Sequence, residues 1–365
     1  MGASDLRTPL HDLHLALGGK MVGFAGYAMP LHYPGGIIAE HRQCRGKAAF
    51  FDVSHMGQLE LHGAGAATAL ERLLPSAIED LKPGKARYSV LTGEAGGILD
   101  DLIVSNAGDH LFVVVNASRR AQDLAHLRKH LSGIELRELT DHALVAVQGP
   151  AAEAVVASLA PAARDLVFME TAATEILGAP CRLSRLGYSG EDGYEISMPA
   201  AAATAIARAL LAHGYCAPAG LGARDSLRLE AGLPLYGKDL GPDTSPVEAQ
   251  LQWLIHKRRR SEGNFPGAAR ILKELAEGPA RKLVGLKPEG RAPARTGTEV
   301  AAPGGGILGK VTSGGFGPTL GAPISIGYVA TAAAEPGTKL NLMIRGKPQP
   351  AEVTALPFVP HRYKR

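Results

Sequence analysis

Alternation of hydrophobic and polar positions predicts two α+β units followed by an all-β unit. In the first unit, apolar segments at 88–91, 99–104 and 110–115 predict three successive strands with turns between them, and a helical repeat follows at 119–131. The segments before them predict, in chain order, a helix at 38–49, strands at 51–56 and 58–61, and a short helix at 66–74.

The next part of the chain shows the same order of elements without any repeat of the residues themselves. A strand at 144–147 is followed by a helix at 151–159, strands at 181–186 and 194–198, and a helix at 200–211. Strands and helices that mix in this way are typical of compact α+β units.

From Arg281 onward the pattern changes to short apolar segments separated by glycine and proline. This pattern is typical of a small β-barrel or sandwich. The predicted strands are 282–286, 306–312, 324–329, 339–344 and 350–354. The clearest domain boundary therefore lies near 274–282.

Composition narrows the class of protein. A chain of 365 residues that is 45% hydrophobic and 20% charged fits two or three globular domains. A net charge of +4 does not require a nucleic-acid partner, and no apolar run approaches the roughly 18 residues of a membrane helix. We therefore expect neither nucleic acid nor membrane as a partner.

The cysteines and the first residues bear on the compartment. Cys44, Cys181 and Cys216 are far apart and form no CxxC pair, which favours reduced interior thiols over disulfides or a zinc site. Residues 1–5 carry neither a basic nor an apolar targeting segment. We expect a cytoplasmic protein, although a processed mitochondrial matrix protein would have the same features.

The segment 187–197, GYSGEDGYEIS, is the strongest candidate for a binding element. Its glycines permit turns and close backbone approach, and 194–197 alternates like a strand. Glu195 then points to the face opposite Tyr194 and Ile196, where a carboxylate can grip paired N–H donors. The alternative is a hairpin turn whose acids are solvated.

Asp100 and Asp101 interrupt the apolar strand 98–104. Because neighbouring strand residues face opposite ways, we expect one carboxylate to point into a core or cleft and the other to solvent. The buried one could meet positive charge or take a proton. An edge strand with both acids solvated is the alternative.

Several other motifs give weaker indications of a functional site. Asp52, Ser54 and His55 cannot form a triad because triad members converge from separate elements, so His55 is interpreted as a buried, satisfied histidine. The segment 304–312 has phosphate-loop spacing but lacks the following Ser or Thr and the helix. The basic run 257–260 is expected on a solvated face, and Trp253 belongs either to the core or to a cavity wall. No cluster has metal-ligand spacing.

Taken together, these segments resemble the glycine cleavage T-protein, or aminomethyltransferase, family from end to end. The resemblance rests on the order and spacing of its motifs, since each one alone is weak. They are TPLH (8–11), GKMV (19–22), FDVSHM (51–56), GGILDDLIV (96–104), GYSGEDGYEIS (187–197), GARDSLRLEAG (222–232), PVE (246–248), TSG (312–314) and FVP (358–360).

The resemblance implies a three-domain cloverleaf around a central folate channel, with two mixed α/β domains and a C-terminal β-barrel. The implied divisions are 1–52 plus 140–235 for the first, discontinuous domain; 53–139 plus 236–275 for the second, ferredoxin-like domain; and 276–365 for the barrel. It also implies a reaction that needs no metal. The methylene of an S-aminomethyl-dihydrolipoyl group on the partner H-protein passes to tetrahydrofolate, releasing ammonia and 5,10-methylenetetrahydrofolate.

The same resemblance implies roles for individual residues. Asp101 matches the catalytic aspartate, which positions folate and stabilises the cationic methylene carbon or acts as a base. Glu195 matches the carboxylate that binds the pterin, and Arg224 matches a substrate contact. Tyr88, Met56 and Tyr188 match cavity-lining positions, Asn116 is expected near the entrance for the lipoyl arm, and Tyr363, or its neighbour Arg362, makes a C-terminal contact.

Two rival functions remain at this stage. A folate-dependent demethylase of the same fold would often be fused to a flavin oxidase, but no dinucleotide-binding fingerprint follows an N-terminal strand here. A folate-binding accessory protein for iron–sulfur maintenance would carry a cysteine-containing motif after the central region, where this chain has GNFPG at 263–267.

Overall fold

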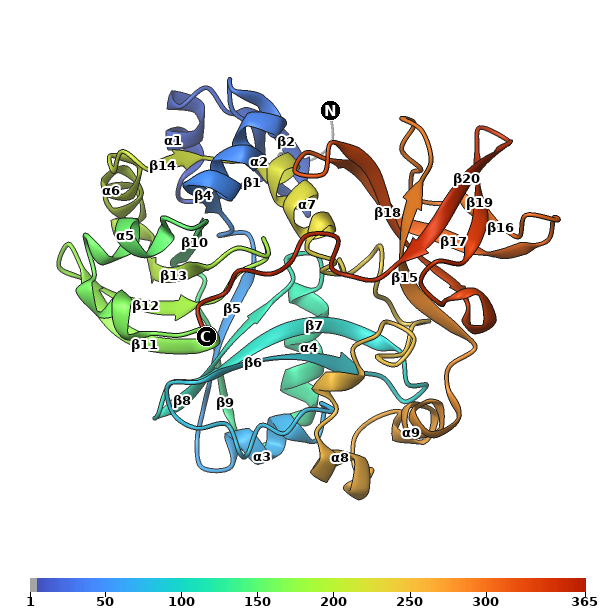
Figure 1. The fold of residues 1–365 in the computed structure, drawn as a ribbon. Coiled ribbons are helices and arrows are strands. Elements are labelled where there is room, and N and C mark those ends of the chain that lie inside the picture. The colour runs from blue at the N-terminus through green and yellow to red at the C-terminus, as the bar shows by residue number, and fades with distance from the viewer. Residues whose placement is uncertain (1–4) are drawn as a thin grey trace.

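The computed structural model describes residues 5–365. Residues 1–4, which contribute to the expectation about the compartment, lie outside the described part. Two open sheets and a barrel surround the middle of the molecule, and the C-terminal segment crosses that middle (Figure 1). Among residues 5–365, no helix combines the length and the apolar character needed to cross a membrane.

The first open sheet has six strands that come from separate parts of the sequence. The apolar strand β10 lies inside it, between β13 and β4, and is buried on both faces apart from its first residue. Helices α5 and α6 pack on one face through a core that includes Tyr194 and Ile196. The strand order is β11 (Glu170–Ile176), β12 (Ala179–Arg185), β13 (Gly193–Pro199), β10 (His142–Gln148), β4 (Ala48–Asp52) and β14 (Cys216–Pro218).

The second open sheet carries the two adjacent aspartates. Its order is β6 (Ala86–Thr92), β7 (Ile98–Asn106), β8 (His110–Val115), β5 (Gly57–His62) and β9 (Glu135–Glu138), and all neighbours are antiparallel. One face packs on α3 and α4, where Leu102 and Val104 of β7 share a core with Leu124 and Leu127 of α4. The opposite face of β6 and β7 turns toward the middle of the molecule (Figure 1).

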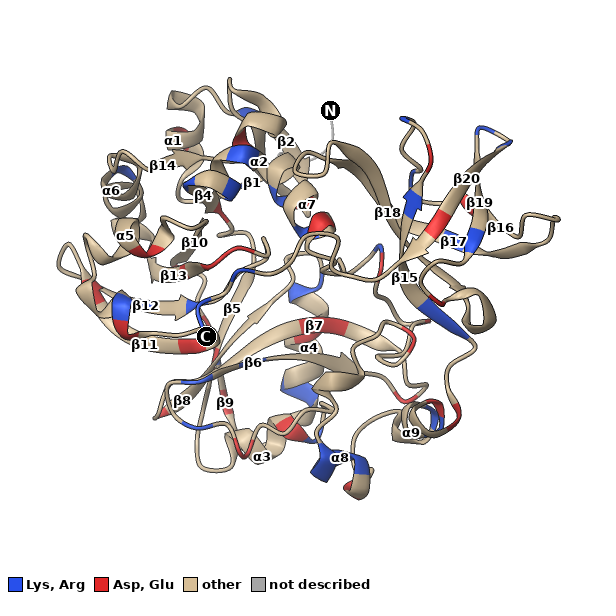
Figure 2. Cartoon of the chain, viewed as in Figure 1, with Lys and Arg blue, Asp and Glu red and all other residues tan. Residues whose placement is uncertain are grey.

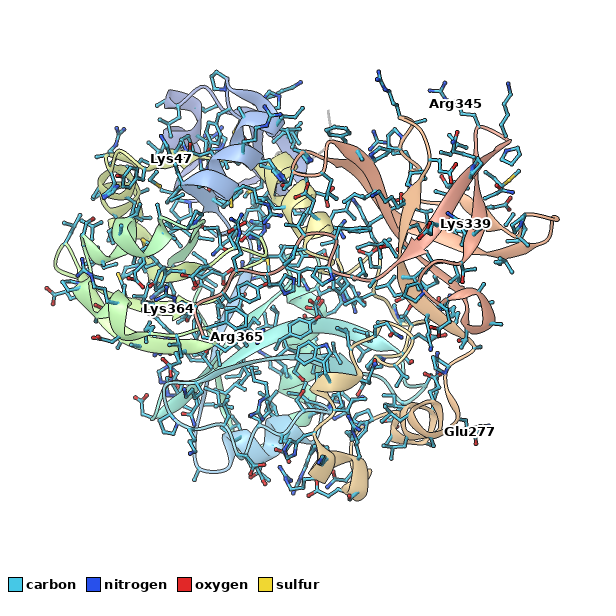
Figure 3. The ribbon with its side chains drawn as sticks, in the orientation of Figure 1. Lys47, Glu277, Lys339, Arg345, Lys364 and Arg365 are labelled. Carbon is cyan, nitrogen blue, oxygen red and sulfur yellow. The ribbon has the colours of Figure 1, made fainter. Side chains whose placement is uncertain are left out.

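The C-terminal unit is a closed barrel around its own apolar core. Its strands, in order around the barrel, are β15 (Arg281–Pro288), β18 (Ala322–Ala330), β17 (Ile307–Gly317), β16 (Glu299–Ala301), β19 (Lys339–Ile344) and β20 (Lys347–Thr354). Lys339 and Arg345, labelled on the barrel in Figure 3, lie at its outer side.

The remaining elements connect these units. A small sheet of β1 (Leu6–Arg7), β3 (Tyr27–His32) and β2 (Lys20–Phe24) covers one side of the middle. The α-helices are α1 (His11–Ala16), α2 (Gly36–Gly46), α3 (Ala66–Glu71), α4 (Arg120–His130), α5 (Ala152–Ala157), α6 (Ala200–Leu211), α7 (Leu221–Glu230), α8 (Lys257–Glu262) and α9 (Ala268–Glu277). Short 3-10 turns lie at Pro161–Asp165, Gln252–Leu254 and Thr331–Ala333.

The predicted fold class, with mixed α/β units and a C-terminal β-barrel, is confirmed. The helix predicted at 38–49 is too long, because 48–52 is a fully buried strand and a continuous apolar run does not distinguish helix from strand. Strand β11 was not predicted. The boundaries of the three domains, as given above, stay a prediction.

Candidate functional site

A cavity of about 930 Å³ lies where the units meet, which is within the size range of small-molecule sites. Strands β6, β7 and β13, helix α7, the loop 231–238, the barrel and the C-terminal segment all contribute to its walls. The predicted site residues that line it are Met56, Tyr88, Asp101, Asn116, Tyr188, Glu195, Arg224 and Tyr363. The structure therefore brings together every residue that the sequence singled out as catalytic or binding.

Strand geometry places Asp101 in this cavity. Asp101 pairs with Val90 of β6, and its side chain lies on the face turned away from α4. The Tyr88 hydroxyl donates to Asp101 Oδ2 at 3.1 Å, and Asn116 Nδ2 donates to Oδ1 at 2.6 Å. Burial, together with the nearby charge of Asp100, raises the pKa of Asp101 to about 7. The carboxyl group can therefore change its protonation state near neutral pH.

Asp100 does not face solvent, so the prediction that one of the two acids is solvated is wrong. Asp100 is 0% exposed. Its carboxyl oxygens accept hydrogen bonds from the backbone nitrogen of Asn116 at 3.1 Å and from the Asn116 side chain at 2.9 Å. The reason is that the other face of β7 is covered by α4. The acidic stretch of β7 appears as the red band in the middle of that strand in Figure 2.

Glu195 lies on a wall of the cavity that the six-stranded sheet forms. Tyr194 and Ile196 point into the core of the six-stranded sheet, so the period of two turns Glu195 toward the cavity, as predicted. The preceding turn depends on glycine: a Cβ at Gly187 would lie 1.9 Å from Gln148 Oε1, and Gly190 has φ +77°. Burial raises the pKa of Glu195, while the charge of Arg224 opposes that rise.

Arg224 comes from α7 and lies over the ring of Tyr188, with 5.0 Å between its Cζ and the ring centroid. Neither Glu195 nor Arg224 makes a side-chain hydrogen bond or an ion pair to any residue between 5 and 365. Both side chains are half-buried and line the cavity, so their hydrogen-bonding capacity is free for a ligand.

Aromatic side chains form the flat walls. Tyr88 stacks on Trp253 with ring centroids 5.8 Å apart and an interplanar angle of 25°. Trp253 is thus a cavity wall and not core, and it is 64% exposed. The Tyr188 hydroxyl donates to the carbonyl of Pro234, which fixes its ring. Phe24 and Phe168 also line the cavity, and no sequence motif marked either of them.

The C-terminal segment closes one side of the cavity. Tyr363 stacks on Phe168 at 4.0 Å between centroids and lines the cavity, whereas Arg362 Nε donates to Glu191 Oε1 at 3.1 Å. Phe168 N donates to the carbonyl oxygen of Lys364 at 2.7 Å. Figure 3 labels Lys364 and Arg365 where this segment meets the six-stranded sheet. Of the two C-terminal candidates, Tyr363 is the one with access to a ligand.

His55 is buried, as predicted, but not satisfied. Its ring packs edge-on against Phe24 at 5.6 Å, and Nδ1 has no hydrogen-bond partner among the described residues. Burial, despite the opposing charge of Asp52, lowers the pKa of His55 to about 4. His55 therefore presents an uncharged imidazole at the cavity wall at neutral pH.

Two charged motifs for which a solvated position was considered each contain one buried residue. Glu191 is 1% exposed and joins Arg45 at 2.7 Å, and Arg45 continues to Glu230 at 3.0 Å, so the turn acid anchors the C-terminal segment to the core. In the basic run 257–260, Arg259 is 1% exposed and donates to the carbonyls of Glu71 and Leu74. Both partners come from distant segments, which a local pattern does not reveal.

Metal ligands do not gather in the described part of the chain, where no group of three or more His, Cys, Asp or Glu residues is placed to hold a metal ion. The three cysteines are free and buried. The chemical groups of the cavity are therefore carboxylates, a guanidinium, phenols and an imidazole.

Fold and cavity together define an α+β protein whose small-molecule cavity carries carboxylates from two different sheets among aromatic side chains. The chain matches the family models described as "GCVT N-terminal domain" over residues 10–259 and "Glycine cleavage T-protein C-terminal barrel domain" over 281–360. It belongs to the glycine cleavage T-protein family, and its predicted identity as an aminomethyltransferase enzyme of that family is confirmed.

Individual relatives agree with this. The chain is 45% identical to the probable mitochondrial aminomethyltransferase of Schizosaccharomyces pombe, covering 98% of this chain and 94% of the relative. It is 44% identical to the mitochondrial aminomethyltransferase of Pisum sativum, and the match covers 98% of this chain and 90% of the relative. Among solved structures, the glycine cleavage system aminomethyltransferase T of Bartonella henselae superposes with a TM-score of 0.94 at 41% identity, covering 99% of this chain and all of that one.

Proposed function

We propose that this protein transfers the methylene of an S-aminomethyl-dihydrolipoyl group, carried by H-protein, to tetrahydrofolate, with release of ammonia and 5,10-methylenetetrahydrofolate. The observation that carries the proposal is the pair of carboxylates, Asp101 of β7 and Glu195 of β13, that line one aromatic cavity. When bound, tetrahydrofolate supplies the nitrogen that accepts the methylene.

The cavity fits such a ligand. A pterin is flat and presents adjacent N–H donors on one edge, and Glu195 is a carboxylate whose oxygens no described side chain occupies. Tyr88, Tyr188 and Met56 would hold the flat rings between them, while Arg224 would donate to an oxygen acceptor of the substrate. Tyr363 would close the C-terminal side.

Asp101 is assigned the role next to the reacting methylene. A carboxylate in a buried site stabilises a neighbouring cationic carbon, and its hydrogen bonds from Tyr88 and Asn116 hold it in place for that task. Asn116 therefore orients Asp101 in addition to lying where the lipoyl arm is expected to enter. A change of protonation near pH 7 also allows Asp101 to take part in proton transfer.

The proposal includes the partner and the compartment. H-protein is the expected donor, tetrahydrofolate is the expected co-substrate, and no metal is required by the assigned roles. Free buried cysteines fit a reducing compartment, which we propose to be the cytoplasm or the mitochondrial matrix. The relatives from fission yeast and pea are themselves named mitochondrial.

The test is ammonia release from aminomethylated H-protein, measured with and without tetrahydrofolate. We expect release to be fast only when tetrahydrofolate is present, and formation of 5,10-methylenetetrahydrofolate to match it mole for mole. Release that does not respond to tetrahydrofolate contradicts the proposal. A demethylase function predicts instead that an N-methylated amino acid replaces aminomethylated H-protein as the donor.

A further inference from the structure

His55 lines the cavity with a polar ring to which the proposed reaction assigns no role. The residue is 4% exposed, and its Nδ1 atom is enclosed without a hydrogen-bond partner among residues 5–365. Nε2, at the outer corner of the ring, has no partner among these residues either and stays open to the cavity. A buried polar group without a partner is costly. The cavity is the side from which a partner can reach this ring.

The neighbours of His55 offer it no free polar atom. Phe24 packs edge-on against the ring, with 5.6 Å between centroids. The Tyr27 ring lies 6.3 Å away, and its hydroxyl accepts a hydrogen bond from Arg120 Nη1 at 3.0 Å. Asp52, three residues earlier in the chain, has both carboxylate oxygens engaged elsewhere. Its partners are Thr8 Oγ1 at 2.6 Å, His14 Nε2 at 2.8 Å and the Ser54 backbone nitrogen at 2.9 Å.

Strand register separates His55 from the carboxylate of the six-stranded sheet. Glu195 lies opposite Ala146 of β10, and Ala146 lies opposite Phe51 of β4. His55 comes four residues after Phe51, beyond the end of β4. Two strand spacings and the intervening residues therefore put the backbones of His55 and Glu195 about 10 Å or more apart. The imidazole is not part of the wall assigned to the pterin.

His55 lies instead close to the support of Asp101. The turn that carries His55 leads into β5, whose first residue, Gly57, pairs with Val115 of β8. Asn116 directly follows Val115, and its side chain donates to Asp101 Oδ1 at 2.6 Å. The role proposed for Asp101 puts the reacting methylene at this end of the cavity, and the lipoyl arm is expected to enter beside Asn116. The ring of His55 therefore belongs to the donor side of the site.

The donor brings one strongly polar group to that side, which is the nitrogen released as ammonia. An amine offers N–H donors, and a neutral imidazole can form a hydrogen bond with it. Burial lowers the pKa of His55 to about 4, so the ring adds no positive charge that would repel an ammonium group. The rest of the lipoyl arm is an alkyl chain with sulfur atoms, which are weak hydrogen-bond partners.

We propose that His55 is a substrate-contacting residue whose Nε2 forms a hydrogen bond with the nitrogen of the aminomethyl group, so that the cavity distinguishes the loaded lipoyl arm from the empty one. This inference rests on the proposed function. Because His55 is separate from the Glu195 wall, its loss affects the donor and leaves tetrahydrofolate binding unchanged.

Equilibrium binding in the absence of tetrahydrofolate tests the contact without turnover. Two probes are compared, H-protein that carries the aminomethyl group and H-protein that carries only the dihydrolipoyl arm. His55→Phe keeps a flat ring against Phe24 but removes both ring nitrogens. It should weaken binding of the aminomethylated form by about 10-fold and change binding of the dihydrolipoyl form by less than about twofold. Equal effects on the two forms, or no effect on the aminomethylated form, overturn the proposal.

Two amide variants test which ring nitrogen makes the contact. His55→Gln puts its amide near the position of Nε2 and should keep kcat/KM for aminomethylated H-protein within about threefold of wild type, whereas His55→Asn, which reaches only the position of Nδ1, should lose about 10-fold. His130→Gln is the matched control, because it makes the same change at the exposed end of α4. The Kd of tetrahydrofolate should stay near wild type in every variant, and a loss confined to tetrahydrofolate binding contradicts the assignment to the donor.

Nitrogen-15 NMR of wild-type protein labelled at histidine makes the test independent of whether a variant folds. Aminomethylated H-protein should shift the imidazole resonance of one uncharged histidine, and dihydrolipoyl H-protein should not. The absence of this difference overturns the proposal. If wild-type protein does not release ammonia from aminomethylated H-protein when tetrahydrofolate is present, the proposed function fails and the inference fails with it. If it does, and His55→Phe behaves like wild type, only the role of His55 fails.

Discussion

Replacement of Glu195 by glutamine tests the binding wall of the cavity. The change keeps the shape of the side chain but exchanges one acceptor oxygen for an NH₂ group, so a ligand with two adjacent N–H donors loses one charge-assisted hydrogen bond and meets a donor in its place. Hydrogen bonds to charged groups are worth about 1.5–3 kcal/mol. The expected loss in tetrahydrofolate affinity is therefore about 10- to 150-fold.

Isothermal titration of tetrahydrofolate into wild-type and Glu195→Gln protein measures this loss directly. Glu175→Gln is the control, because it makes the same chemical change at an exposed position of β11 in the same sheet. An unaltered Kd in Glu195→Gln would rule out the contact, as would an equal loss in the Glu175→Gln control.

The thermal stability of the unliganded protein tests the same assignment, because there Glu195→Gln should have a stabilising effect. Burial raises the pKa of Glu195, so the native state binds a proton more tightly than the unfolded chain, and the ionised side chain costs stability once pH exceeds the unfolded value near 4.3. Glu195→Gln should therefore raise Tm at pH 8 while it weakens ligand binding. A lower Tm would show that Glu195 has a stabilising partner in the folded protein.

Three further predictions follow from the site and the core. Asp101→Ala should lower turnover by about two orders of magnitude or more with only modest loss of tetrahydrofolate affinity, measured by steady-state rates and titration, and unchanged turnover would refute the role. Because burial raises the pKa of Asp101 to about 7, turnover that needs the ionised form should fall as pH drops through 7, and a flat profile between pH 6 and 8 would contradict this. Arg259→Ala should lower the free energy of unfolding, measured in urea, by about 3–5 kcal/mol, because it leaves buried acceptors around Glu71 unpaired. Lys257→Ala should lower it little, and equal effects of the two substitutions would refute the assignment.

Local periodicity predicted the directions of the key side chains. The alternation in 194–197 turned Glu195 away from the core, and the period of two in β7 separated Asp100 from Asp101. These outcomes depend only on neighbours in the sequence, which is why one sequence sufficed. The change to short strands after Arg281 located the barrel for the same reason.

Contacts between distant segments were beyond the reach of such patterns. One interpretation placed Asp100 in solvent, because nothing in the sequence of β7 shows that α4 covers the face of the strand that carries Asp100. Arg259 was expected in solvent because Glu71 lies 188 residues away. Trp253 could not be assigned to core or cavity until its stacking on Tyr88 was known.

The surroundings of Asp100 show a related limit. Asp100 was visible in the sequence, but Asn116 was expected only near the entrance for the lipoyl arm and not as a partner of the two acids. Only the folded structure shows that the Asn116 side chain donates hydrogen bonds to both Asp100 and Asp101.

The central claim, that one cavity transfers a methylene from H-protein to tetrahydrofolate, is tested most directly by a single turnover with isotopically labelled aminomethyl H-protein. The account predicts that all label lost from H-protein appears in 5,10-methylenetetrahydrofolate, together with one ammonia for each methylene, and that Asp101→Ala slows this transfer while it still binds tetrahydrofolate. Label that leaves H-protein as free formaldehyde at the same rate with and without tetrahydrofolate would contradict it.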